Sequence, residues 1–146
     1  VPMIAVWSGK IVAGSETDHI SAFWDVFPTM AEISGASVPE DIDGISFLPT
    51  LLGNEENQKE HEYMYWEFHE RGGRQALRKE NWKLVKYNVL DPDKTTTELY
   101  NLETDLGEEN NLAEQHPEIV EELSEIMKNA RTESEIFTFD ATGYLQ

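Results

Sequence analysis

The chain has 146 residues, 29 of them acidic and 11 basic, and a formal charge of −18. This charge disfavours nucleic acid as the main partner, because phosphate binding needs a basic face. The chain has no cysteine, which excludes disulfides, thiolate zinc sites and a cysteine nucleophile within it. No apolar run approaches the roughly 20 residues that a membrane helix needs.

The chain opens with "VPMIAVW", residues 1–7, which is apolar at every position. Such a run is typical of a parallel strand that is buried on both faces. The next 50 residues contain no second run of this kind, so we expect the partner strands to precede Val1. The chain also begins without an initiator methionine. Both observations predict that the 146 residues are part of a longer protein.

The apolar residues of the segment 20–36, "ISAFWDVFPTMAEISGA", have helical spacing, and Gly35 is the predicted end of the helix. Pro28 predicts a break, after which a second helix would start with a proline in its first turn. Prolines and glycines then predict short turns and one helical turn up to residue 54. The polar run "EENQKEHE", residues 55–62, is the predicted domain boundary.

Beyond that boundary the composition is typical of strands. Residues 62–70 predict a strand and "RGGR" predicts a hairpin turn; further strands are expected at 75–79, 82–87 and 98–102. Residues 117–131 have the apolar spacing of an amphipathic helix. We therefore expect an antiparallel sheet of about four strands, with the helix packed on it through Leu123 and Met127. The predicted domains are 1–56 and 60–131, followed by a tail at 132–146.

Residues 63–87 hold three of the five tyrosines, two of the four tryptophans and six of the eleven lysines and arginines. In so small a sheet, large rings supply much of the apolar burial. The basic residues are expected to balance local acids and to direct positive potential towards an anionic substrate. An alternative is a carbohydrate-binding module with exposed tryptophan and tyrosine as stacking platforms.

Two acidic motifs have a functional and a plain interpretation. The first, "VLDPDKT", resembles the opening of haloacid-dehalogenase-type phosphatases, with Asp91 as nucleophile and Asp93 as acid or base. The second, "ETDLGEENN" at 103–111, has the alternating oxygens of a calcium loop. A turn is the favoured interpretation of both, because neither has the partner residues or the flanking elements that its chemistry requires.

His69 ends the predicted aromatic strand, just before the turn at Gly72 and Gly73. Strand alternation gives two rows of side chains: the apolar row, which we expect to face the helix, is Met64, Trp66 and Phe68, and the other is Tyr65, Glu67 and His69. Glu67 and His69 should then point away from the core. Either a structural or a functional role is open to His69.

Five stretches of the chain, taken in order, closely resemble the C-terminal portion of bacterial arylsulfatase-type sulfatases. They are "VAGSETDH", "DVFPTMAEISGA", "DIDGISFLPTLLG", "RKENWKLV" and "ELYNLETDLGEENNLA". The resemblance runs nearly end to end. It implies an α/β fold: the end of an alkaline-phosphatase-like domain, then a small α+β domain with a four-stranded antiparallel sheet and one helix. It also implies a parent enzyme that hydrolyses aryl or carbohydrate sulfate esters and is periplasmic or secreted.

The resemblance implies that the catalytic centre lies outside this chain. Such enzymes use calcium and a formylglycine made from Cys or Ser in a C/S-x-P-x-R motif, and the chain contains no such motif. Its main partner would therefore be the preceding catalytic domain, and we expect no catalytic residue and no metal ligand within it. Since the small domain adjoins the cleft in this family, the resemblance makes His69, Glu67 and Arg74 candidates for binding the substrate.

Overall fold

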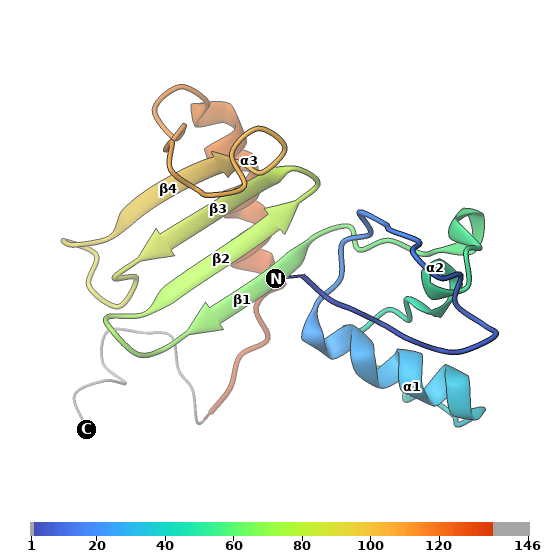
Figure 1. Cartoon of the computed structure of the whole chain (residues 1–146). Coiled ribbons are helices and arrows are strands. Elements are labelled where there is room, and N and C mark those ends of the chain that lie inside the picture. Colours follow the sequence, from blue (N-terminus) through green and yellow to red (C-terminus); the bar gives the residue numbers. More distant parts are fainter. Residues whose placement is uncertain (1, 136–146) are drawn as a thin grey trace. The chain divides into compact units, whose positions relative to one another are not determined.

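The computed structural model describes residues 2–135 and divides the chain into two compact units, with the division between His61 and Glu62. The first unit is built from short helices and loops, and the second contains a sheet and a long helix (Figure 1). Within the described residues, no helix has the length and apolar character that a membrane span requires.

The helices of the first unit are short. They are η1 (Phe23–Asp25), α1 (Val26–Ser34), α2 (Leu48–Leu51) and η2 (Glu55–Asn57). Gly35 ends α1 in a left-handed conformation with φ 70°, as predicted. The predicted proline in the first turn of a new helix is confirmed, because α1 starts at Val26 and the missing N–H of Pro28 leaves no hydrogen bond unmade there. The predicted position of the break is wrong: the change from η1 to α1 lies between Asp25 and Val26, before Pro28.

The apolar segment at the start of the chain is not a strand. Residues 2–7 have no regular structure, and the side chains of Ile4 and Val6 are 91% and 86% exposed. The prediction of a buried parallel strand is therefore wrong for this chain. A strand forms only when a neighbour completes its hydrogen bonds, and the described part of this unit contains no other strand.

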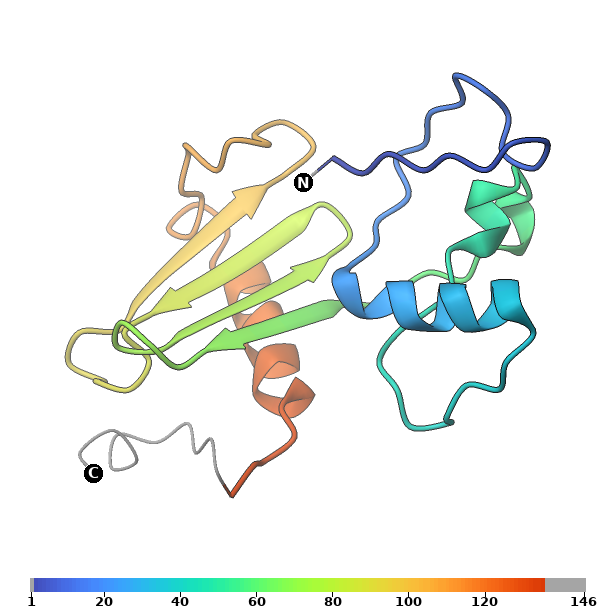
Figure 2. The ribbon, with the colours of Figure 1, turned by 60° about the horizontal axis from the view of Figure 1, so that its bottom comes forward.

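The second unit has the predicted antiparallel sheet, in the order β1-β2-β3-β4. The strands are β1 (Met64–Phe68), β2 (Arg74–Lys79), β3 (Trp82–Tyr87) and β4 (Thr96–Asn101), and helix α3 (Pro117–Ala130) follows them. Each strand pairs with the next in sequence, and α3 covers one face (Figure 2). The predicted sheet and covering helix are confirmed.

One row of leucines forms the core of this unit. Leu77, Leu84 and Leu99 face one another across β2, β3 and β4 and are fully buried. Leu123 and Met127 of α3 pack on this row with 2% exposure each. The predicted contact of α3 through these two side chains is confirmed, and it follows from their spacing of four residues.

The prediction of which row of β1 faces the helix is wrong. Tyr65 pairs with Leu77 in the sheet register and packs against the core under α3, so the row of Tyr65 and Glu67 is on the helix side. The other row includes Trp66 and Phe68, which are 37% and 50% exposed. The face of an edge strand is decided by its cross-strand partners, and here the leucines of β2 and β3 select the helix side.

Candidate functional site

The hairpin end between β1 and β2 holds the candidate substrate-binding residues, and two glycines shape it. Gly72 and Gly73 have φ values of 82° and 77°, in the region that favours glycine. A Cβ on Gly73 would lie 2.7 Å from Cγ of Leu90. The 88–90 segment is hydrogen-bonded to this turn, because the amides of Val89 and Leu90 donate to Gly73 and Gly72. The predicted turn is thus confirmed as a tightly packed feature.

Glu67 is the centre of a polar cluster on the helix side of β1. Its Oε2 accepts hydrogen bonds from the Tyr65 hydroxyl at 2.7 Å and from Nε of Arg131, just after α3, at 3.1 Å. Gln75 donates in turn to the Tyr65 oxygen at 2.8 Å. Burial and the Glu67 carboxylate raise the pKa of Tyr65 well above its ordinary value, which keeps the hydroxyl a donor.

His69 lies beside this cluster, just beyond the end of β1. Its Nε2 is 4.0 Å from Oε1 of Glu67, and about a fifth of its side chain is exposed. Glu67 and His69 are therefore together, as strand alternation predicts. However, Glu67 points towards the end of α3 rather than away from the core, because its row faces the helix.

Arg74 is on the opposite face of the sheet from Glu67. It pairs with Phe68 in the register, and its guanidinium lies over the Tyr87 ring at 5.3 Å. Its Nε is buried without a hydrogen-bond partner in the described part of the chain. A guanidinium stacked on an aromatic ring is suited to a planar or tetrahedral oxyanion through its terminal N–H groups. The structure thus brings His69 and Glu67 together and separates Arg74 from them.

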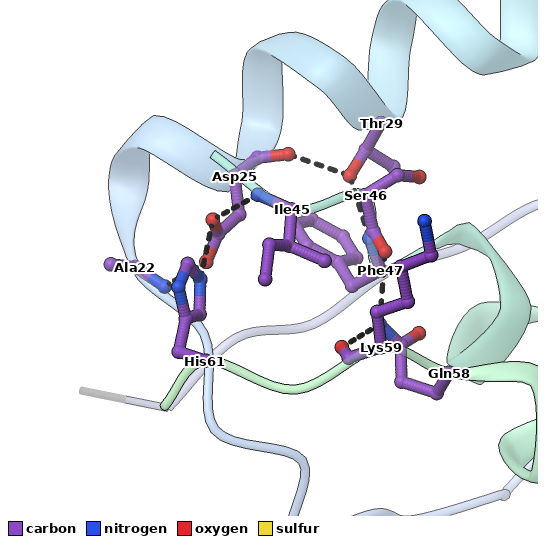
Figure 3. Close-up of polar contacts among 9 residues, drawn as sticks. All are labelled: Ala22, Asp25, Thr29, Ile45, Ser46, Phe47, Gln58, Lys59 and His61. Carbon is purple, nitrogen blue, oxygen red and sulfur yellow. Dashed lines mark hydrogen bonds and ion pairs between the residues drawn. The ribbon is translucent and has the colours of Figure 1, made fainter. Parts of the chain in front are cut away.

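The first unit contains a second polar cluster, centred on Asp25 (Figure 3). Its carboxylate is 1% exposed and accepts three hydrogen bonds, from the amides of Ala22 and Ile45 and from Nε2 of His61, at 2.6, 2.8 and 2.9 Å. A buried carboxylate with three donors is well satisfied. The cluster therefore holds the chain in place rather than offering a reactive group.

Thr29 extends this cluster along α1. Its hydroxyl donates to the Asp25 carbonyl at 2.6 Å and accepts from the Phe47 amide at 3.0 Å. Together with the bond from Ile45, it fastens the 45–47 segment to the helix, as Figure 3 shows. The Asp-x-x-Pro-Thr pattern is thus a structural motif. No local pattern predicts the role of His61, which lies in the polar run of residues 55–62.

The two acidic motifs are turns, as predicted. Asp91 pairs with Lys94 at 2.6 Å and accepts the Asp93 amide, and the hydrogen bond from Lys94 lowers the Asp91 pKa. The carboxylate of Asp105 accepts backbone N–H groups at the end of its own loop, and these lower its pKa. Within residues 2–135, no three His, Asp or Glu side chains gather in a way that could hold a metal ion.

Residues 1–133 match the protein family described as "N-sulphoglucosamine sulphohydrolase, C-terminal". The chain is 29% identical over 144 residues to N-acetylgalactosamine-6-O-sulfatase of Bacteroides thetaiotaomicron, covering 90% of this chain and 27% of that protein. It is 30% identical over 135 residues to human arylsulfatase K, covering 86% of this chain and 24% of that protein. The chain thus spans about a quarter of the length of these two relatives.

Solved structures share the fold. Ps i-CgsB, also crystallised with k-i-k-neocarrahexaose, superposes with a TM-score of 0.68 at 26% identity, covering 85% of this chain and 27% of that one. A 2-O GAG sulfatase superposes with a TM-score of 0.61 at 28% identity, covering 73% of this chain and 23% of that one. The predicted fold class, the end of an alkaline-phosphatase-like α/β domain followed by a small α+β domain, is confirmed.

Proposed function

Because this chain belongs to the family of C-terminal sulfatase domains described as N-sulphoglucosamine sulphohydrolase, C-terminal, we propose that it completes an enzyme that hydrolyses sulfate esters. The match over residues 1–133, nearly the whole chain, is the observation that carries this proposal. The two curated relatives named above are sulfatases, and the match to each covers 86% or more of this chain.

Carbohydrate sulfates are the substrate class that the relatives support best. One relative is named for the 6-O-sulfate of N-acetylgalactosamine, and one solved structure for a 2-O-sulfate of glycosaminoglycans. A second solved structure holds a neocarrahexaose. We therefore propose a sulfated glycan as substrate, with an aryl sulfate as a useful test compound. By the same family likeness, we propose that the whole enzyme is periplasmic or secreted.

The catalytic centre is proposed to lie in the part of the relatives that this chain does not span. Calcium and formylglycine are the expected cofactors of that part. The described residues do not fit a calcium site, because they contain no cluster of three acidic or histidine side chains suited to a metal. The chain's own contribution is therefore to bind and orient the substrate, and the 146 residues alone should not hydrolyse a sulfate ester.

The residues proposed for this contribution are His69, Glu67 and Arg74. Glu67 is fixed by Tyr65 and Arg131, and its Oε1 lies 4.0 Å from Nε2 of His69, which is beyond hydrogen-bond distance. His69 would donate to a sugar hydroxyl or a sulfate oxygen. Arg74, on the other face, lies over the Tyr87 ring and would pair with a second oxyanion of a longer substrate.

Sulfate release tests the proposal. The full-length protein, matured to carry formylglycine and supplied with calcium, should release sulfate from galactosamine 6-sulfate or from an aryl sulfate. The isolated 146-residue chain should release none. Turnover by the isolated chain would contradict the assignment of the catalytic centre. A matured full-length protein that is inactive on a panel of sulfated sugars and aryl sulfates would contradict the sulfatase proposal itself.

A further inference from the structure

A groove runs between the sheet of the second unit and α3, with a volume of about 530 Å³. This size is within the usual range of small-molecule sites. β2 and β3 contribute Gln75 and Lys86, and the helix contributes Ser124 and Met127. Val89, from the loop after β3, adds a further apolar side chain.

Lys86 differs from the other lysines of its unit. Those four each have a carboxylate within 4.0 Å: Lys79 with Glu122, Lys83 with Glu108, Lys94 with Asp91 and Lys128 with Glu125. Among the described residues Lys86 has no such partner, although the chain has 29 acids. It is half-buried, and burial lowers its pKa. A desolvated ammonium without a counter-charge is a costly feature.

The remaining charges of the groove are nearly balanced. Arg131 is paired with Glu67 at 3.1 Å, and Lys128 is 4.0 Å from Glu125. The other charged group is Glu121, an exposed residue on the helix wall. The groove therefore offers one unpaired cation on the sheet side and a carboxylate acceptor on the helix side.

We propose that this groove binds an acidic sugar unit, whose sulfate or carboxylate group pairs with Lys86. An oxyanion supplies the counter-charge that Lys86 lacks. Sugar hydroxyls suit the amide of Gln75, the hydroxyl of Ser124 and the carboxylate of Glu121. The aliphatic face of the ring would cover Val89. The choice of a sugar rests on the proposed function, whereas the oxyanion site at Lys86 does not.

Competitive acetylation of lysines in the full-length protein tests this site directly. The rates at Lys86 and at Lys94, the exposed control, are read by peptide mass spectrometry with galactose 6-sulfate, galacturonate, galactose or inorganic sulfate, each at constant ionic strength. A bound oxyanion raises the pKa of Lys86 and shrinks its reactive fraction, so its rate should fall about tenfold at about pH 8. The rate at Lys94 should not change.

Each outcome decides a part of the proposal. Protection by the sulfated sugar or by the uronate, but not by galactose, supports it, and the stronger of the two identifies the anion. Equal protection by inorganic sulfate would overturn the sugar assignment, and no protection by any anion would overturn the site. Because labelling needs no hydrolysis, an inactive protein that still shows protection would contradict the sulfatase proposal alone.

A pair of variants gives an independent measure of binding. Equilibrium dialysis measures how much galacturonate the full-length protein binds. The Lys86→Met variant should bind less galacturonate, because the groove no longer binds it, whereas the Lys94→Met variant should bind as much as the unchanged protein. Methionine keeps most of the length and the apolar stem of lysine, so the packing beside α3 is preserved. Unchanged binding by a folded Lys86→Met variant would overturn the assignment of Lys86.

Discussion

The two units of the chain are held together by different kinds of interaction. Among residues 2–135, seven side chains are the largest of those that are fully buried, and five of them form the apolar core of the second unit: Leu77, Leu84, Leu99, Leu123 and Met127. The other two, Asp25 and Thr29, are polar and lie in the first unit. One unit thus depends on apolar burial, and the other on buried hydrogen bonds.

The difference also shows at the surface of the first unit. Ile4, Val6 and Phe23 are between 86% and 91% exposed there, although they are apolar. Large exposed apolar groups mark surfaces that meet a partner. In the proposed sulfatase, these side chains would pack against the rest of the α/β domain. The polar cluster around Asp25 holds the local path of the chain through hydrogen bonds within this unit.

The core of the second unit should respond most strongly to substitution. Leu123→Ala removes a side chain that is 2% exposed from the contact between α3 and the leucine row. The free energy of unfolding should fall by about 2–5 kcal/mol, the usual cost of a buried leucine. Urea denaturation followed by circular dichroism measures this change. Glu121→Ala, on the exposed side of the same helix, is the control and should change stability by less than about 0.5 kcal/mol.

The polar cluster of the first unit should show a smaller and more local effect. Asp25→Ala leaves the amides of Ala22 and Ile45 without an acceptor, which costs about 1–3 kcal/mol for a buried group. Hydrogen exchange at Ile45 should accelerate, while the amides of β3 should keep their protection. Asp41→Ala, at an exposed position of the same unit, serves as the control. Equal acceleration in both units would show that they unfold together.

The candidate site should respond in kinetics and not in stability. In the full-length enzyme, His69→Ala should lower kcat/KM by about tenfold, equivalent to about 1.4 kcal/mol, with little change in melting temperature. Glu70→Ala, at the exposed neighbouring position, is the matched control. A fall in melting temperature with unchanged kcat/KM per folded molecule would make His69 a structural residue of the turn.

Local patterns predicted the second unit better than the first. The spacing of Leu123 and Met127 places both on one helix face, and the composition of β1 to β3 is typical of strands, so these elements followed from neighbouring residues. The face of β1 was predicted wrongly because it depends on Leu77, which pairs with Tyr65 from the next strand. The hydrogen bond between Asp25 and His61 joins residues 36 positions apart, and the periodicity of apolar residues along the sequence cannot indicate such a pair.

The smallest expected effect concerns the exposed apolar segment at the start of the chain. Ile4→Ser with Val6→Ser replaces two side chains that make little contact within the chain, so the stability of the second unit should change by less than about 0.5 kcal/mol. Self-association of the isolated chain, measured by light scattering, should nevertheless decrease, because contiguous apolar surface drives association. Leu106→Ser is the control: this leucine is 83% exposed but isolated in a polar loop of the second unit. If Leu106→Ser reduced association as much as the double variant, total apolar exposure would be responsible, and the first unit would have no special need of a partner surface.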